Sequence, residues 1–111
     1  ALAMLNNVTF VESARFLAER MLRQDSSSPA DRIDWAFRLV TSRAPQAGET
    51  ELLKDDLAAY LRDFQAAPEA ARRLLKTGEK PFSKGLDVPM LAAYTLVANT
   101  ILNLDESMSQ N

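Results

Sequence analysis

The feature that most constrains the fold is an apolar segment near the C-terminus, residues 88–104, which reads VPMLAAYTLVANTILNL. Its apolar residues occupy too much of a helical circumference for a helix that buries only one face. We therefore predict a central helix against which other helices pack. A membrane span is disfavoured, because about 17 residues fall short of the roughly 20 that a span requires. The segment also contains two asparagines and two threonines.

The two sides of this predicted helix differ in polarity. The larger apolar residues gather on one side, namely Met90, Tyr94, Val97, Ile101 and Leu104. A polar strip lies on roughly the opposite side and consists of Thr95, Asn99 and Asn103. Because these three residues are spaced four apart, they share one face and are candidates for contact with a partner or substrate.

Composition excludes several kinds of chemistry. The chain has 111 residues, which suits a single helical domain with one core, and it contains neither cysteine nor histidine. These absences exclude sulfur-based zinc sites, histidine general bases and covalent c-type haem attachment within this segment, so we expect no cofactor here. A net charge of −2 gives no general attraction to nucleic acid or anionic lipid.

The chain begins Ala-Leu-Ala-Met and carries neither a basic nor a long apolar leader. We expect it to be the C-terminal fragment of a larger protein.

Four helices are expected before the central one, at residues 10–23, 29–42, 47–66 and 68–76. Thr9 and Glu12 match a capping box for the first helix, and Ser28-Pro29 supplies an N-cap and a first-turn proline for the second. Gly78 is a candidate left-handed stop for the fourth. A loop then leads to the central helix, which we expect to start at Pro89. A polar tail over residues 107–111 should fray. The predicted fold class is all-α, a compact bundle of four to five helices around a central apolar C-terminal helix.

Two aromatic residues do not fit the apolar stripes of their helices. Phe16 lies in the middle of a polar face that includes Glu12 and Glu19. It is either an isolated exposed aromatic, which is common, or a contact with other parts of the parent protein. Trp35 lies to the side of the stripe of the second helix, and we expect core packing, with partial exposure as the alternative.

Two charged clusters have ordinary structural explanations. The acids Glu49, Glu51, Asp55 and Asp56 lack the alternating oxygen ligands and glycine of a calcium loop, and we interpret them as solvated surface. Residues 69–84 carry five cations against two acids. Only Phe82 could stack on a base in that region, so nucleic-acid binding is not favoured.

Four blocks resemble a known family. They are residues 1–7 (ALAMLNN), 10–20 (FVESARFLAER), 32–45 (RIDWAFRLVTSRAP) and 94–106 (YTLVANTILNLDE). In order and spacing they are similar to a planctomycete family, domain of unknown function 1553. One departure is Gln46, where the family tends to place a threonine or serine cap.

The resemblance implies a domain at the end of a large protein that also carries a cytochrome-c-like domain. It therefore implies export, upstream domains as partners and haem in those domains, and it implies no known reaction.

Several functional hypotheses remain. The first, which we prefer, is a non-catalytic structural or interaction domain that packs against the upstream domains through Phe16 and the Thr95, Asn99 and Asn103 strip. The second is a share in an enzyme active site formed with those domains, for which the polar candidates are Asn6, Asn7, Asn99, Asn103 and Asp105. A structural role for these amides is the stronger interpretation, because buried amides usually have structural partners. A groove that binds a peptide through Met90, Trp35 and Phe16 is a third hypothesis.

Overall fold

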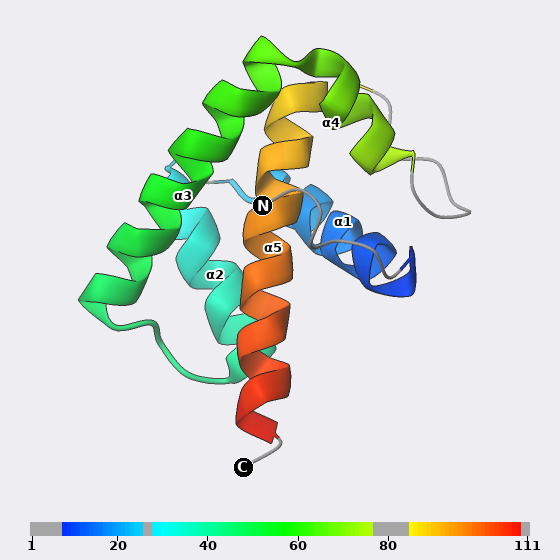
Figure 1. The fold of residues 1–111 in the computed structure, drawn as a ribbon. Coiled ribbons are helices and arrows are strands. Elements are labelled where there is room, and N and C mark those ends of the chain that lie inside the picture. The colour runs from blue at the N-terminus through cyan, green and yellow to red at the C-terminus, as the bar shows by residue number, and fades with distance from the viewer. Residues whose placement is uncertain (1–7, 26–27, 77–84, 110–111) are drawn as a thin grey trace.

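The computed structural model describes residues 8–25, 28–76 and 85–109, with side chains at 11–25, 28–76 and 85–104. These residues form five helices and no strand, which confirms the all-α prediction (Figure 1). The helices are α1 (Val8–Leu22), α2 (Pro29–Thr41), α3 (Ala47–Ala66), α4 (Pro68–Leu75) and α5 (Val88–Ser109).

Helix α5 is the centre of the fold. It contacts each of the other four helices, and in Figure 1 it runs between α3 on one side and α1 and α4 on the other. Every residue from 91 to 99 is buried, so the middle of the helix is enclosed around its whole circumference. This confirms the prediction made from its apolar composition. Each fully buried leucine or isoleucine here contributes about 1.5–3 kcal/mol relative to an exposed position.

Both ends of α5 differ slightly from the prediction. The helix starts at Val88 rather than Pro89, and the Asp87 carbonyl accepts the Leu91 N–H at 2.8 Å. Proline is tolerated at the second helical position because its missing N–H would have no intrahelical acceptor there. At the other end the helix continues to Ser109, through part of the expected polar tail. Extending an existing helix adds one hydrogen bond per residue, which favours continuation beyond the packed part.

Helix α1 begins earlier than predicted. It already includes Val8 and Thr9, so Thr9 is not the N-cap. The predicted apolar face is buried, namely Val11, Ala14, Leu17, Ala18 and Met21. The assignment of Glu19 to the polar face is wrong, because Glu19 is only 4% exposed. The buried side of α1 is therefore wider than its apolar stripe.

Arg15 explains why the buried side is wider. Its side chain is completely buried, and its Nη1 donates to the carbonyl oxygen of Leu75 at 3.0 Å. Leu75 is the last residue of α4, where carbonyls lack intrahelical donors. The Nε atom lies 3.8 Å from Oε2 of Glu19, and Arg23 Nη2 lies 3.3 Å from Oε1 of the same carboxylate. The Arg15 side chain thus joins α1 to the end of α4, and Glu19 lies beside it among buried apolar residues.

Ser28 caps the start of α2 as predicted, because its hydroxyl oxygen accepts the Asp31 N–H at 3.4 Å.

Hydrogen bonds also hold the connection from α2 to α3. Ser42 ends α2 in the left-handed conformation, with φ of 63°. Glu49 accepts the Gln46 N–H at 2.9 Å and two bonds from Arg43 at 2.9 and 3.0 Å. Helix α3 therefore starts at the predicted residue although Gln46 replaces the usual small cap.

Glu49 consequently has a structural role that the other acids of α3 lack. The paired Arg43 guanidinium and the Gln46 N–H lower the pKa of Glu49 to about 2. Glu51 and Asp55 are exposed, as predicted for solvated surface, and Asp56 is half-buried. The predicted stop at Gly78 lies outside the described residues.

Candidate functional site

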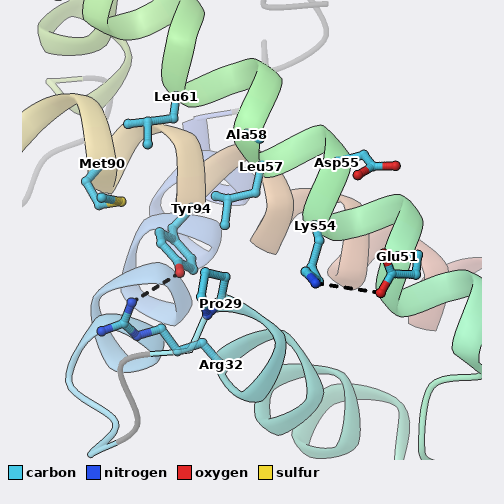
Figure 2. Close-up of a pocket in the computed structure, with 10 residues that line it drawn as sticks. All are labelled: Pro29, Arg32, Glu51, Lys54, Asp55, Leu57, Ala58, Leu61, Met90 and Tyr94. Atoms are coloured by element: carbon cyan, nitrogen blue, oxygen red, sulfur yellow. Dashed lines mark hydrogen bonds and ion pairs between the residues drawn. The ribbon is translucent and has the colours of Figure 1, made fainter.

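A cleft of about 440 Å³ lies between the start of α2, the middle of α3 and the first turns of α5 (Figure 2). This volume is within the range of small-molecule sites in proteins. The lining residues come from all three helices. They are Pro29, Arg32, Glu51, Lys54, Asp55, Leu57, Ala58, Leu61, Met90 and Tyr94.

Arg32 and Tyr94 form the floor of the cleft. Tyr94 is 1% exposed, and its hydroxyl accepts a bond from Arg32 Nη1 at 3.3 Å. The Arg32 guanidinium carbon lies 5.7 Å from the centroid of the Tyr94 ring, within range of a cation–π interaction. Buried positions on α5 therefore fix the tyrosine, and the tyrosine in turn orients the half-buried arginine.

The charge of Arg32 is not balanced by a neighbouring acid. Its Nε is buried and has no hydrogen-bond partner, and no described carboxylate lies within ion-pair distance of its guanidinium. By contrast, Arg38 on the same helix pairs with Asp34 at 2.8 Å. A partly desolvated cation without a counter-charge is unfavourable, since its lost hydration is not replaced.

The wall formed by α3 is apolar near the floor and charged at the rim. Leu57 is buried and Leu61 is half-buried, and Met90 of α5 faces them across Tyr94 in Figure 2. At the rim, Lys54 Nζ lies 3.6 Å from Glu51 Oε1, a loose pair between exposed groups. Asp55 points away from Tyr94 in the same view. The cleft therefore combines an apolar wall with one unpaired cation at its base.

The predicted aromatic candidates lie elsewhere, on the outer sides of α1 and α2. Phe16 is 41% exposed, and Trp35 is half-buried and packs against the core. The Arg20 guanidinium carbon lies 5.3 Å from the centroid of the Trp35 ring. Phe16 and Arg20 are one helical turn apart, so they share a face of α1. We call Phe16, Arg20 and Trp35 the aromatic surface.

The polar strip of α5 runs from the interior to the outside. Thr95 is fully buried and donates its hydroxyl to the Leu91 carbonyl at 2.7 Å. Asn99 is 8% exposed, and its Oδ1 is buried without a hydrogen-bond partner. Asn103 is exposed. None of the three lines the cleft.

The other polar candidates are not placed. Asn6 and Asn7 lie outside the described residues, as does the side chain of Asp105.

Sequence reasoning missed the role of Arg32, although one signal was present. Arg32 lies in the first turns of α2, four residues after the cap Ser28, where the helix dipole disfavours a cation. A counter-charge near such an arginine would offset this unfavourable interaction. Met90 and Tyr94 lie on the main apolar face of α5, as the sequence predicts.

The described ranges offer no candidate for two other kinds of site. No group of three or more acidic, cysteine or histidine side chains there is arranged to hold a metal ion. Over the same part of the chain, no helix combines the length and apolar content needed to cross a membrane.

The fold and the site define a class, an all-α domain with one central helix and a cleft beside it. The family described as "Protein of unknown function (DUF1553)" matches residues 1–57, which is about half of the chain. The chain belongs to this family.

A curated relative supplies a second comparison. Effector protein hopAB1 of Pseudomonas syringae pv. syringae (strain B728a) is 37% identical over 101 residues, which cover 90% of this chain and 17% of the effector. The chain thus spans about a sixth of the length of that relative. No solved structure matches the chain.

Proposed function

We propose that this chain is a non-catalytic helical domain of a larger protein, and that it contacts the rest of that protein through the aromatic surface. The observation that carries the proposal is the exposure of Phe16, which is 41% exposed on a helix whose opposite side is buried against α5. Aromatic residues and arginine are enriched at protein interfaces, and this surface contains Phe16, Trp35 and Arg20.

One comparison and the family resemblance support the setting of a larger protein. The similar segment of hopAB1 occupies 17% of that protein, so a segment similar to this chain can be part of a much longer protein. The resemblance to planctomycete proteins adds upstream domains as the partner, with export and an upstream haem domain as part of the same proposal. The word "effector" in the name of the relative specifies no reaction, and we carry no activity over from it.

The test compares two exposed apolar positions in the full-length protein. Phe16→Ala should weaken the association of this domain with the upstream domains by about tenfold or more, since truncating an aromatic hot-spot residue costs about 2 kcal/mol or more. Leu52→Ala is the matched control, because Leu52 is 62% exposed on α3, away from the aromatic surface. Association would be measured by adding the domain to the upstream part in trans. Equal affinities for the two variants would contradict the proposal, as would a large loss of stability in the isolated Phe16→Ala domain.

A second candidate function is a contribution to an active site shared with the upstream domains, with redox chemistry linked to haem in those domains. Asn99 favours it, because its buried Oδ1 has no partner and a buried unpaired amide oxygen costs about 1–3 kcal/mol. The missing hydrogen bond would be formed if a substrate or a neighbouring domain supplied a donor to this atom. Substituting Asn99 with leucine in the full-length protein, with Leu52→Ala as control, separates the two functions. Unchanged turnover would remove the catalytic role.

A further inference from the structure

We infer that the cleft between α2, α3 and α5 is a binding site for a small amphipathic carboxylate, with the carboxylate at Arg32 and the apolar body against α3. The inference does not depend on the aromatic surface, because none of its three residues lines the cleft. It rests on the unpaired charge of Arg32, the apolar wall and the volume of the cleft.

The head-group site is the Arg32 guanidinium. Nη1 is engaged with the Tyr94 hydroxyl at 3.3 Å, and Nε is buried without an acceptor. The guanidinium has therefore lost part of its hydration and has gained no counter-charge from the described residues. An anion at this position would supply the missing charge in a setting of reduced dielectric, where charge-assisted hydrogen bonds are stronger than in water.

The geometry of the guanidinium favours a carboxylate over a simple ion. Arginine presents parallel N–H donors that match the two oxygens of a carboxylate. Lys54 provides a second cation at the rim, 3.6 Å from Glu51. The two acids of the lining oppose an anion least at the Arg32 end, because Glu51 is paired with Lys54 and Asp55 points away from the floor (Figure 2).

The apolar wall of the cleft favours a ligand with an apolar body. Leu57, Leu61 and Met90 surround the ring of Tyr94 in Figure 2 and offer an apolar surface above the arginine. A volume of about 440 Å³ accommodates a short acyl chain or a compound of similar size. A ligand with a charged head and an apolar body of this length would cover both parts of the cleft, which an inorganic anion would not.

The first experiment measures the binding of octanoate to the chain, with octanol and octylammonium as matched probes. Octanoate should bind with saturation, and the neutral and cationic probes should bind at least about tenfold more weakly, since they lack the charge-assisted bonds to Arg32. Equal binding of octanol and octanoate would overturn the inference, as would the absence of saturable octanoate binding below about 10 mM.

The second experiment locates the site. In protein labelled at leucine and methionine methyl groups, octanoate should shift the signals of Leu57, Leu61 and Met90 and leave those of Leu39 and Leu52 unchanged. Leu39 and Leu52 are exposed and lie outside the cleft. Shifts confined to the exposed leucines would indicate surface adsorption and would contradict the proposal.

Variants complete the test. Arg32→Gln should weaken octanoate binding by about tenfold or more, and Arg32→Lys, which keeps the charge but loses the planar donors, should have a smaller effect. Arg38→Gln is the matched control on α2, because Arg38 is paired with Asp34 and lies outside the cleft. Circular dichroism would show whether each variant is folded, and Arg32→Lys serves if the glutamine variant is not. Equal losses in the Arg32 and Arg38 variants, or binding of a peptide with an apolar C-terminal residue in the absence of octanoate binding, would overturn the assignment.

Discussion

Helices α3 and α5 have nearly the same length, 20 and 22 residues, yet they occupy opposite environments. In α5, all residues from 91 to 99 are buried, whereas α3 buries only Leu53, Leu57 and Phe64 and leaves Leu52 62% exposed. Both helices contain leucine and alanine, but α5 is apolar around its circumference over residues 88–98, whereas α3 carries charged residues such as Glu51 and Asp55 on its exposed side. Identical substitutions in the two helices should therefore have very different effects.

The largest effect is expected from truncating a leucine in each helix. Leu91→Ala in α5 should lower the free energy of unfolding by about 2–5 kcal/mol, because it removes a fully buried side chain and leaves a cavity. Leu52→Ala in α3 should change it by no more than about 0.5 kcal/mol. Urea unfolding measures both values, and similar losses in the two variants would remove the distinction between the helices.

Removal of the buried arginine beside α5 is expected to have the next largest effect. Arg15→Met leaves the Leu75 carbonyl without its side-chain donor and takes one cation from Glu19, although Arg23 still lies 3.3 Å from that carboxylate. We expect a loss of about 2–3 kcal/mol, below the 3–5 kcal/mol typical of a fully broken buried pair.

A double variant distinguishes the charge from the packing in this region. Arg15→Met combined with Glu19→Leu should recover most of the stability, since it removes both buried charges and keeps apolar volume. A double variant less stable than Arg15→Met alone would show that the pair itself stabilises the fold.

The start of α3 should make stability depend on acid pH. The pKa of Glu49 is lowered from 4.5 to about 2 by its bonds with Arg43 and the Gln46 N–H. Because the pKa is lower in the folded state, the stabilisation is fully present above about pH 4.5 and is lost as the pH falls towards 2. Glu49→Gln should lack this part of the pH dependence, and Arg43→Gln should lack most of it. Unfolding free energies measured over this range would refute the role of Glu49 if the three profiles were parallel.

The smallest effect is expected at Thr95. Its hydroxyl donates to the carbonyl of Leu91 within the same helix, at 2.7 Å, and that contact involves no other element. Thr95→Val keeps the shape of the side chain, so the free energy of unfolding should change by less than about 1 kcal/mol. Association with the upstream domains should be unchanged. A large loss of association without loss of stability would restore Thr95 as a contact residue.

Much of the fold was predictable because it follows from local patterns. The enclosure of α5 followed from its apolar circumference, and the start of α2 followed from Ser28 and Pro29, whose preferences act within one turn. The burial of Glu19 and Arg15 was not predictable in this way. It depends on the end of α4 lying above α1, which is a tertiary arrangement that a helical wheel does not contain.

The cleft, too, could not be predicted from local sequence patterns. Tyr94 and Met90 were correctly placed on the main face of α5, but that face meets a space beside α3 rather than continuous packing. Only the positions of three helices together reveal that Arg32 faces this space with no described acid within ion-pair distance. The dipole of α2 gave a signal that Arg32 was unusual, but it could not identify the tyrosine beneath it.

Hydrogen exchange of the α5 backbone tests the central claim most directly. If α5 is the enclosed centre of the bundle, the amides of residues 92–101 should exchange only through global unfolding, with an opening free energy equal to that from urea unfolding. The amides on the exposed side of α3 should open at lower free energy. If residues 92–101 exchanged as readily as those of α3, the placement of α5 at the centre of the fold would be contradicted.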